Sequence, residues 1–158
     1  MRKVVSLGKL VDLVKKLKNQ GKKIVLVGGC FDVLHPGHVI FLEKAKKAGG
    51  ILVILLEPDQ KVKALKGVDR PIHTQKMRAK VLSALQAVDF CLMLPLLKSE
   101  AAYDKVIQKI QPDIIAATQG YRENLHHQRA AQLVGARLKY VTKVIANHST
   151  SRILSRSD

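Results

Sequence analysis

The sequence is poor in the residues that mark several common protein classes. It has no tryptophan, aromatic residues make up 4% of the chain, and its only cysteines are Cys30 and Cys91. Two cysteines without metal-type spacing predict neither a disulfide framework nor a zinc site, and so few aromatic rings suit single-stranded nucleic acid badly. No apolar run reaches the roughly 18 residues of a membrane helix, and the basic N-terminal segment lacks the apolar core of a secretory signal. We therefore expect a cytoplasmic protein without a membrane span.

Acidic residues are also scarce. The chain has 12 Asp and Glu against 28 Lys and Arg, which gives a formal net charge of +16. Such a field concentrates phosphates, nucleic acids or acidic lipids near the surface, but it does not choose among them. A solvated basic surface explains many of these lysines equally well. We do not expect nucleic acid as the partner, and a non-catalytic nucleic-acid-binding protein is kept as the alternative from a different class.

The chain does contain a regular alternation of apolar, strand-like runs with amphipathic helical patterns. Strands are expected at 23–29, 51–57, 89–94, 113–117 and 137–141, and helices at 7–20, 36–49, 74–87, 99–110 and 122–135. This alternation predicts an α/β fold, namely a Rossmann-like, doubly wound, mainly parallel sheet with helices on both faces. No linker or repeat interrupts the pattern, so we expect one domain over residues 1–158, with an N-terminal helix in residues 1–21 leading into it.

The first strand ends in the stretch "GGCFDVLHPGH", in which His35 and His38 flank a Pro-Gly pair. If a helix begins near Pro36, the two imidazoles share one face and can point to one spot. A helix N-terminus favours phosphate, and two imidazoles there can stabilise the charge of a transferring phosphoryl group. Gly28 and Gly29 would let the backbone approach a ligand closely. A metal is the alternative, but two histidines are too few ligands, so we predict no metal-binding residues.

These residues carry a resemblance to a known family. The stretch "GGCFDVLHPGH" resembles the H-x-G-H signature of the cytidylyltransferase-like nucleotidyltransferase superfamily, and "HSTSRI" near the C-terminus resembles its second signature, S-T-x-K/R. The segment "DQKVKALKGVDRPIHTQKMRAKVLSALQAVDF" between them is similar to the adenylyltransferase domain that makes ADP-heptose. The likeness covers roughly residues 3–154, nearly the whole chain.

The resemblance implies an enzyme that transfers a nucleotidyl group directly. A phosphate of the acceptor attacks the α-phosphorus of a nucleoside triphosphate, pyrophosphate leaves, and no covalent enzyme intermediate forms. The expected reaction moves AMP from ATP to a heptose 1-phosphate-like sugar phosphate. CTP-dependent glycerol-3-phosphate cytidylyltransferase and FMN adenylyltransferase (FAD synthase) are the alternatives. Mg²⁺ is expected on the triphosphate, and a homodimer is a further expectation, since such proteins are often dimeric.

The resemblance also implies the residues of the site. The expected catalytic residues are His35, His38, Lys63, Lys66 and Arg152, with the two lysines in a flexible loop. The nucleotide-binding residues are expected to be Gly28, Gly29, Cys30, Phe31, Asp32, His35, Gly37, His38, Gly120, Ser149, Thr150, Ser151 and Arg152. The acceptor is expected to contact Asp59, Arg70 and Arg78.

Two segments depart from the heptose pattern. Where that group has a polar Asn/Ser-Asp after the second strand, this chain has Glu57-Pro58-Asp59. The stretch "TQGYREN" keeps Gly120 and Tyr121 but lacks the usual acid of the turn after the fourth strand. Because the second segment lies near the nucleotide or the acceptor in the family, the choice between ATP and CTP and the identity of the acceptor stay open at this point.

Overall fold

The computed structural model describes residues 3–120 and 124–143 of the chain. Its strands are β1 (Lys23–Gly29), β2 (Gly50–Leu56), β3 (Phe90–Met93), β4 (Ile114–Gln119) and β5 (Arg137–Lys143). Its helices are α1 (Leu7–Asn19), α2 (Pro36–Gly49), α3 (Asp59–Lys66), α4 (Gln75–Ala84), α5 (Glu100–Ile110) and α6 (Asn124–Val134). The strands form one sheet in the order β3-β2-β1-β4-β5, and each pairing between them is parallel. The predicted fold class is confirmed.

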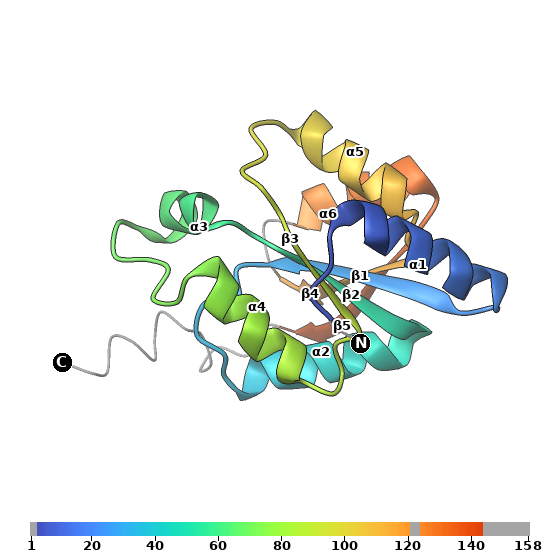
Figure 1. Ribbon diagram of the computed structural model, residues 1–158, viewed down its shortest axis with the longest axis horizontal. Helices are drawn as coiled ribbons and strands as arrows, with labels where there is room; N and C mark the ends of the chain where they lie inside the picture. The colour runs from blue at the N-terminus through green and yellow to red at the C-terminus, as the bar shows by residue number, and fades with distance from the viewer. Residues whose placement is uncertain (1–2, 121–123, 144–158) are drawn as a thin grey trace.

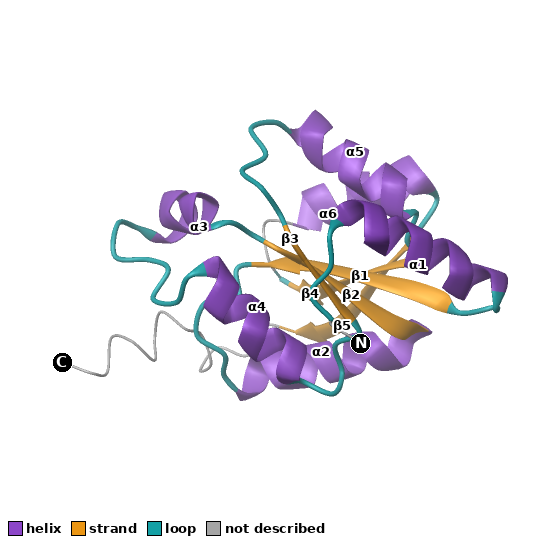
Figure 2. Ribbon diagram, viewed as in Figure 1, coloured by secondary structure: helices purple, strands orange, loops and turns teal. Residues whose placement is uncertain are grey.

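Helices cover the sheet on both faces (Figures 1 and 2). Along β1, Ile24 and Leu26 pack with residues of α1, α5 and α6, whereas Val25 and Val27 pack with residues of α2 and α4. Successive side chains of a strand point to opposite faces, so both halves of each central strand must be apolar. This arrangement explains why "KIVLV" and "ILVILL" are almost continuously hydrophobic.

The helix boundaries follow local signals in the sequence. Ser6 caps α1 by accepting a hydrogen bond from the Lys9 N–H, and Gly21 follows that helix with a φ of +74°, a value that suits glycine. Pro36 is the first residue of α2, where its missing N–H costs nothing. These boundaries confirm the expected helix at 36–49 and place the first helix within one residue of its expected end.

The segment after β2 differs from the expectation. Residues expected to form a flexible loop with Lys63 and Lys66 instead form the helix α3, which lies beyond the carboxyl end of β2 (Figure 1). Asp59 lies in its first turn, the two lysines lie in its last turn, and Gly67 ends it with a φ of +109°. Negative charge at the start and positive charge at the end stabilise a helix through its dipole. The expectation of a loop was therefore wrong.

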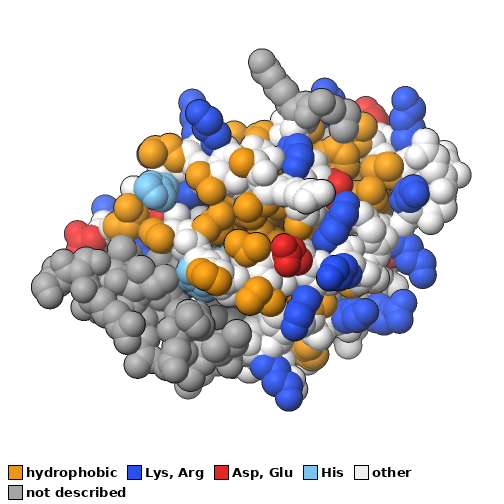
Figure 3. Space-filling model, turned by 90° about the horizontal axis from the view of Figure 1, so that it is seen from below, with side chains coloured by type: hydrophobic (Ala, Val, Ile, Leu, Met, Phe, Trp, Pro, Cys, Tyr) orange, Lys and Arg blue, Asp and Glu red, His pale blue; other side chains and the backbone are white. Residues whose placement is uncertain are grey.

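Much of the positive charge lies away from the carboxyl edge of the sheet. Seen from below, Lys and Arg side chains gather toward the right of the molecule, the side from which β1 starts (Figures 1 and 3). Helices of a parallel α/β sheet run back against the strands, so their C-termini reach this edge, where α1, α2 and α5 carry lysines in their last turns. Lysine at a helix C-terminus stabilises the helix. None of the described helices is long and apolar enough to cross a membrane.

Candidate active site

The topology places a crevice at the end of β1. From β1 the chain passes through α2 to β2 on one side, whereas β4 pairs with β1 on the other side. In open parallel sheets, ligands bind at such a switch point, outside the carboxyl ends of the strands. The loop of residues 30–35 leads from this end of β1 into α2 and carries the first histidine. The sequence signature therefore lies where a ligand is expected.

His35 and His38 lie together at the start of α2. His35 is the N-cap residue of the helix, and the centroids of the two imidazole rings are 3.9 Å apart with the planes inclined by 33°. The Nδ1 of His35 accepts a hydrogen bond from the Gly37 N–H at 3.1 Å, and the Nδ1 of His38 accepts one from the His35 N–H at 3.4 Å. The predicted convergence of the two side chains is what the structure shows.

These backbone contacts decide which ring nitrogen carries the proton. An Nδ1 that accepts a hydrogen bond must offer its lone pair, so the proton of the neutral ring is on Nε2. Each imidazole can then donate an Nε2–H to a ligand oxygen while its Nδ1 caps the helix. Two donors of this kind beside the positive end of a helix form an anion-binding arrangement.

The titration of His38 provides a test of this geometry. Burial, with the nearby charges of His35 and Lys66, lowers the pKa of His38 to about 4. The unfolded chain, with a pKa of about 6.5, then binds the proton more tightly than the folded chain. The free energy of unfolding is therefore expected to fall as the pH drops from about 6.5 to about 4. Above about pH 6.5, the titration of His38 should not change the free energy of unfolding.

The measurement is urea denaturation at a series of pH values, comparing the natural protein with His38→Gln. Glutamine at this position keeps an acceptor for the His35 N–H but does not titrate. Its free energy of unfolding is expected to change less between pH 6.5 and pH 4. Identical pH profiles for the two proteins would contradict the placement of a half-buried, neutral His38.

The two glycines at the end of β1 have different surroundings. A Cβ on Gly29 would lie 2.7 Å from the ring of Phe31, so this glycine makes room for the protein's own side chain. Phe31 itself is buried, with a φ of +44°, and its ring centroid is 5.5 Å from that of His38. Nothing lies within 4 Å of a Cβ built on Gly28. Gly28 therefore leaves open space at the end of β1, whereas Gly29 makes room for the Phe31 ring, and the predicted ligand contact of Gly28 stays a prediction.

Asp32, expected to bind the nucleotide, holds a neighbouring loop. Its buried carboxylate accepts hydrogen bonds from the N–H groups of Ile72 and His73 and from the Nε of Arg70. Burial alone would raise the pKa of Asp32, but these three donors outweigh it and hold the pKa below its usual range. Arg70, expected to contact the acceptor, is thus paired within the protein, and its side chain is 10% exposed.

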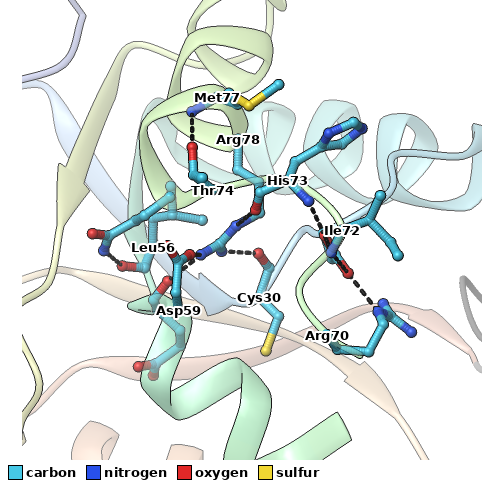
Figure 4. Close-up of polar contacts among 12 residues, drawn as sticks. Cys30, Leu56, Asp59, Arg70, Ile72, His73, Thr74, Met77 and Arg78 are labelled. Atoms are coloured by element: carbon cyan, nitrogen blue, oxygen red, sulfur yellow. Dashed lines mark hydrogen bonds and ion pairs between the residues drawn. The ribbon is translucent and has the colours of Figure 1, made fainter. Parts of the chain in front are cut away.

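Arg78, also expected to contact the acceptor, is the largest fully buried side chain of the described residues. Its guanidinium donates to the backbone oxygens of Cys30, Glu57 and His73 and to the carboxylate of Asp59 (Figure 4). These contacts tie the end of β1, the end of β2 and the start of α4 to one cation. Arg78 is placed to position the site, and direct contact with an acceptor would require breaking these bonds.

The two lysines of α3 differ in their relation to the histidines. The positive charge of Lys66 adds to the lowering of the His38 pKa by burial and opposes the raising of the Cys30 pKa by burial, so its ammonium acts on both groups. Both lysines are exposed, and Lys63 is not among the charges that shift these two pKa values. The catalytic role of either lysine stays a prediction. At the opposite flank of the crevice, Gly120 follows β4 with a φ of +100° and is exposed.

Four predicted residues lie outside the described ranges. They are the members of the second signature, Ser149, Thr150, Ser151 and Arg152. Their predicted contact with the triphosphate stays a prediction.

Three other residues at this edge were not predicted from the sequence. Gln75 donates from its amide to the backbone oxygens of Leu56 and Leu94, which joins the ends of β2 and β3. Tyr103 of α5 donates its hydroxyl hydrogen to the Glu57 carboxylate at 2.9 Å. Glu57 was visible in the sequence as a departure from the family pattern, but nothing in the sequence pairs it with a tyrosine 46 residues away.

Fold and site together define a class, a Rossmann-like α/β domain with a nucleotide-binding fold. Residues 26–155 match the family model described as cytidylyltransferase-like, and the chain belongs to this family.

Curated relatives support this assignment. The protein is 36% identical over 135 residues to the bifunctional protein HldE of Desulfatibacillum aliphaticivorans. The matched residues make up 84% of this chain and 27% of that protein. The HldE of Wolinella succinogenes is 35% identical over 157 residues, 98% of this chain and 31% of that protein. The chain therefore spans about a quarter to a third of the length of the relatives it matches.

Solved structures support the fold. The crystal structure of the lipopolysaccharide core biosynthesis protein from Thermoplasma volcanium GSS1 is similar with a TM-score of 0.60 at 28% identity, covering 79% of this chain and 98% of that chain. Pantoate-beta-alanine ligase from Francisella tularensis has a TM-score of 0.66 at 12% identity, covering 96% of this chain and 69% of that chain, and shares the fold alone.

Proposed function

We propose that this protein is an adenylyltransferase that moves AMP from ATP to a heptose 1-phosphate-like sugar phosphate and releases pyrophosphate. The observation that carries the proposal is the His35–His38 pair, with both Nδ1 atoms engaged by backbone N–H groups at the helix start beside the switch point. The similarity to the HldE proteins supports a sugar phosphate as the acceptor. The similarity to the lipopolysaccharide core biosynthesis protein from Thermoplasma volcanium GSS1 is in line with it.

In the proposed reaction, a phosphate oxygen of the acceptor attacks the α-phosphorus of ATP. The bond from this phosphorus to the α,β-bridging oxygen breaks, and pyrophosphate leaves with the electron pair. The Nε2–H groups of His35 and His38 donate to phosphate oxygens whose negative charge grows during transfer, and Lys66 adds a positive charge nearby. Phosphoryl transfer needs positioning and electrostatic stabilisation more than covalent chemistry.

Mg²⁺ enters this proposal as part of the substrate, MgATP. Asp32 and Asp59 are paired with Arg70 and Arg78, and Glu57 accepts a hydrogen bond from Tyr103. No cluster of three potential ligands occurs among the described residues. The histidines present N–H donors instead of lone pairs. This donor set does not fit a magnesium ion held by the described residues, whereas it suits a triphosphate that carries its own ion.

The test is pyrophosphate release with Mg²⁺, crossing ATP and CTP against heptose 1-phosphate, FMN and glycerol 3-phosphate. The expected result is release with ATP and heptose 1-phosphate at a rate well above the other combinations. Release with CTP and glycerol 3-phosphate, or with ATP and FMN, would identify one of the alternative reactions. Salt-dependent binding to duplex DNA of arbitrary sequence, without turnover of any nucleotide, would replace the proposal by a nucleic-acid-binding protein.

A further inference from the structure

A small cluster of three side chains lies at the end of β2 and has no role in the reaction as proposed above. Glu57, the first residue after β2, accepts a hydrogen bond on Oε2 from the Tyr103 hydroxyl at 2.9 Å. The Nζ of Lys61, on α3, lies 5.9 Å from the centroid of the Tyr103 ring. We refer to Glu57, Lys61 and Tyr103 as the Glu57 cluster. It joins the end of β2 to α3 and α5.

The cluster lies next to the loop that follows β1. The Glu57 N–H donates to the Gly29 oxygen at 3.1 Å, and the oxygens of Glu57 and Cys30 accept from the same Arg78 guanidinium. Burial raises the pKa of the Cys30 thiol, Lys66 opposes this shift, and the charge of Glu57 adds to it. The carboxylate is therefore close enough to the loop to act on its groups.

Glu57 is kept in an environment that disfavours its charge. Burial raises its pKa, against the Tyr103 hydrogen bond and the positive charges of Lys61 and Arg78. Tyr103 binds only Oε2, and no described residue donates to Oε1. Oε1 is therefore left to accept a hydrogen bond from a molecule that binds at this edge of the sheet.

The charge of Glu57 decides which substrate can lie there. A carboxylate repels a triphosphate, whose place is at the His pair and the switch point between β1 and β4. The opposite flank of β1, above the end of β2, is left for the second substrate. A carboxylate oxygen accepts from hydroxyl groups, and Lys61 offers a positive charge beside it. This combination suits a molecule that carries both hydroxyl and phosphate groups.

We infer that Glu57, oriented by Tyr103, is a specificity-determining residue that binds a hydroxyl group of the acceptor. This inference rests on the proposed adenylyltransferase function and adds to it a contact that discriminates among sugar phosphates. A site built to hydrogen-bond a substrate hydroxyl rejects an analogue without it, because its buried polar group is left unpaired.

The experiment compares Glu57→Gln and Tyr103→Phe with the natural protein, using heptose 1-phosphate and its monodeoxy analogues. Glu57→Gln is expected to raise the KM for heptose 1-phosphate about 10-fold or more, because a charged acceptor is lost. The KM for ATP should stay unchanged. In the natural protein one deoxy analogue should be used about 10–100-fold less efficiently, and this penalty should shrink in the variant. Tyr103→Phe should give the same pattern with a smaller change, because the carboxylate remains but loses its orienting donor.

A matched control separates this role from a structural one. Glu43→Gln changes an exposed carboxylate on α2 in the same way and should leave both KM values unchanged. If Glu57→Gln and Tyr103→Phe keep the natural KM for the acceptor and the natural discrimination, the inference is wrong. An equal rise in the KM for ATP and for the acceptor would also overturn it, since a general disturbance of the site acts on both.

Failure of the proposed function would appear differently, as absence of pyrophosphate release by the natural protein with heptose 1-phosphate. Calorimetric titration of heptose 1-phosphate then decides the inference alone. Weaker binding to Glu57→Gln than to the natural protein would support it. Equal binding to both proteins, or binding to neither, would overturn it.

Discussion

Replacing His38 with alanine is expected to lower the rate of pyrophosphate release by about 10²–10³-fold, and His35→Ala should have a comparable effect. Each variant removes an Nε2–H donor aimed at the place where the phosphate charge grows. Each also removes an Nδ1 that accepts from the backbone at the start of α2, so the partner imidazole loses part of its support. Because the two rings act as one unit, the double variant should lower the rate of pyrophosphate release by far less than the product of the two single fold-changes.

The measurement is kcat and KM for ATP under saturating acceptor, with circular dichroism to confirm the fold of each variant. His126→Ala is the matched control, because His126 is exposed on α6 and faces Glu100 of α5. It should leave kcat unchanged. Full activity in both His35→Ala and His38→Ala would show that the pair is not the catalytic centre, even if the protein still transferred AMP.

The second large effect is expected on stability. Arg78→Met should lower the free energy of unfolding by about 3–5 kcal/mol, because three backbone oxygens lose a fully buried donor, at about 1–3 kcal/mol for each acceptor left unsatisfied. Methionine fills much of the volume of arginine but donates no hydrogen bond. It would leave Asp59 without its cation and the oxygens of Cys30, Glu57 and His73 without their shared donor.

Urea denaturation at neutral pH measures this change. Arg78→Lys keeps the charge but cannot donate in four directions from a planar group. Its free energy of unfolding should therefore lie between that of the natural protein and that of Arg78→Met. Arg137→Met changes an exposed arginine of β5 and should alter the free energy of unfolding by less than about 0.5 kcal/mol. Equal stability of Arg78→Met and the natural protein would show that the network adds nothing to the fold.

Both results bear on how the site is assembled. The end of β1 carries the histidines, but the positions of the flanking segments depend on two charged centres, Asp32 and Arg78. Asp32 fixes the segment that precedes α4, and Arg78 fixes the ends of β1 and β2 relative to it. The resemblance predicted ligand contacts for these residues, whereas the structure gives them partners within the chain.

Much of the fold could be predicted because the signals are local. A strand such as "KIVLV" must be apolar on both faces when helices cover both sides of the sheet, and its composition shows this directly. Pro36 and Gly21 mark helix boundaries through the backbone dihedrals they favour. The position of the His pair follows as well, since only residues 30–35 separate the end of β1 at Gly29 from the start of α2 at Pro36. The helix at Asp59–Lys66 was missed although Asp59 and Gly67 marked its ends, because the family likeness suggested a loop.

The partners of the charged and polar side chains could not be predicted in this way. Asp32 meets Arg70 38 residues later, Arg78 meets Cys30 48 residues earlier, and Glu57 meets Tyr103 46 residues later. Periodicity and capping act over a few residues, so they specify elements and their ends. Contacts between distant elements depend on how helices pack against the sheet and on which buried polar groups then need a partner. The sequence alone therefore determines the strands, most helices and the place of the histidines, and tertiary packing decides which neighbouring charges face the site and which are paired within the protein.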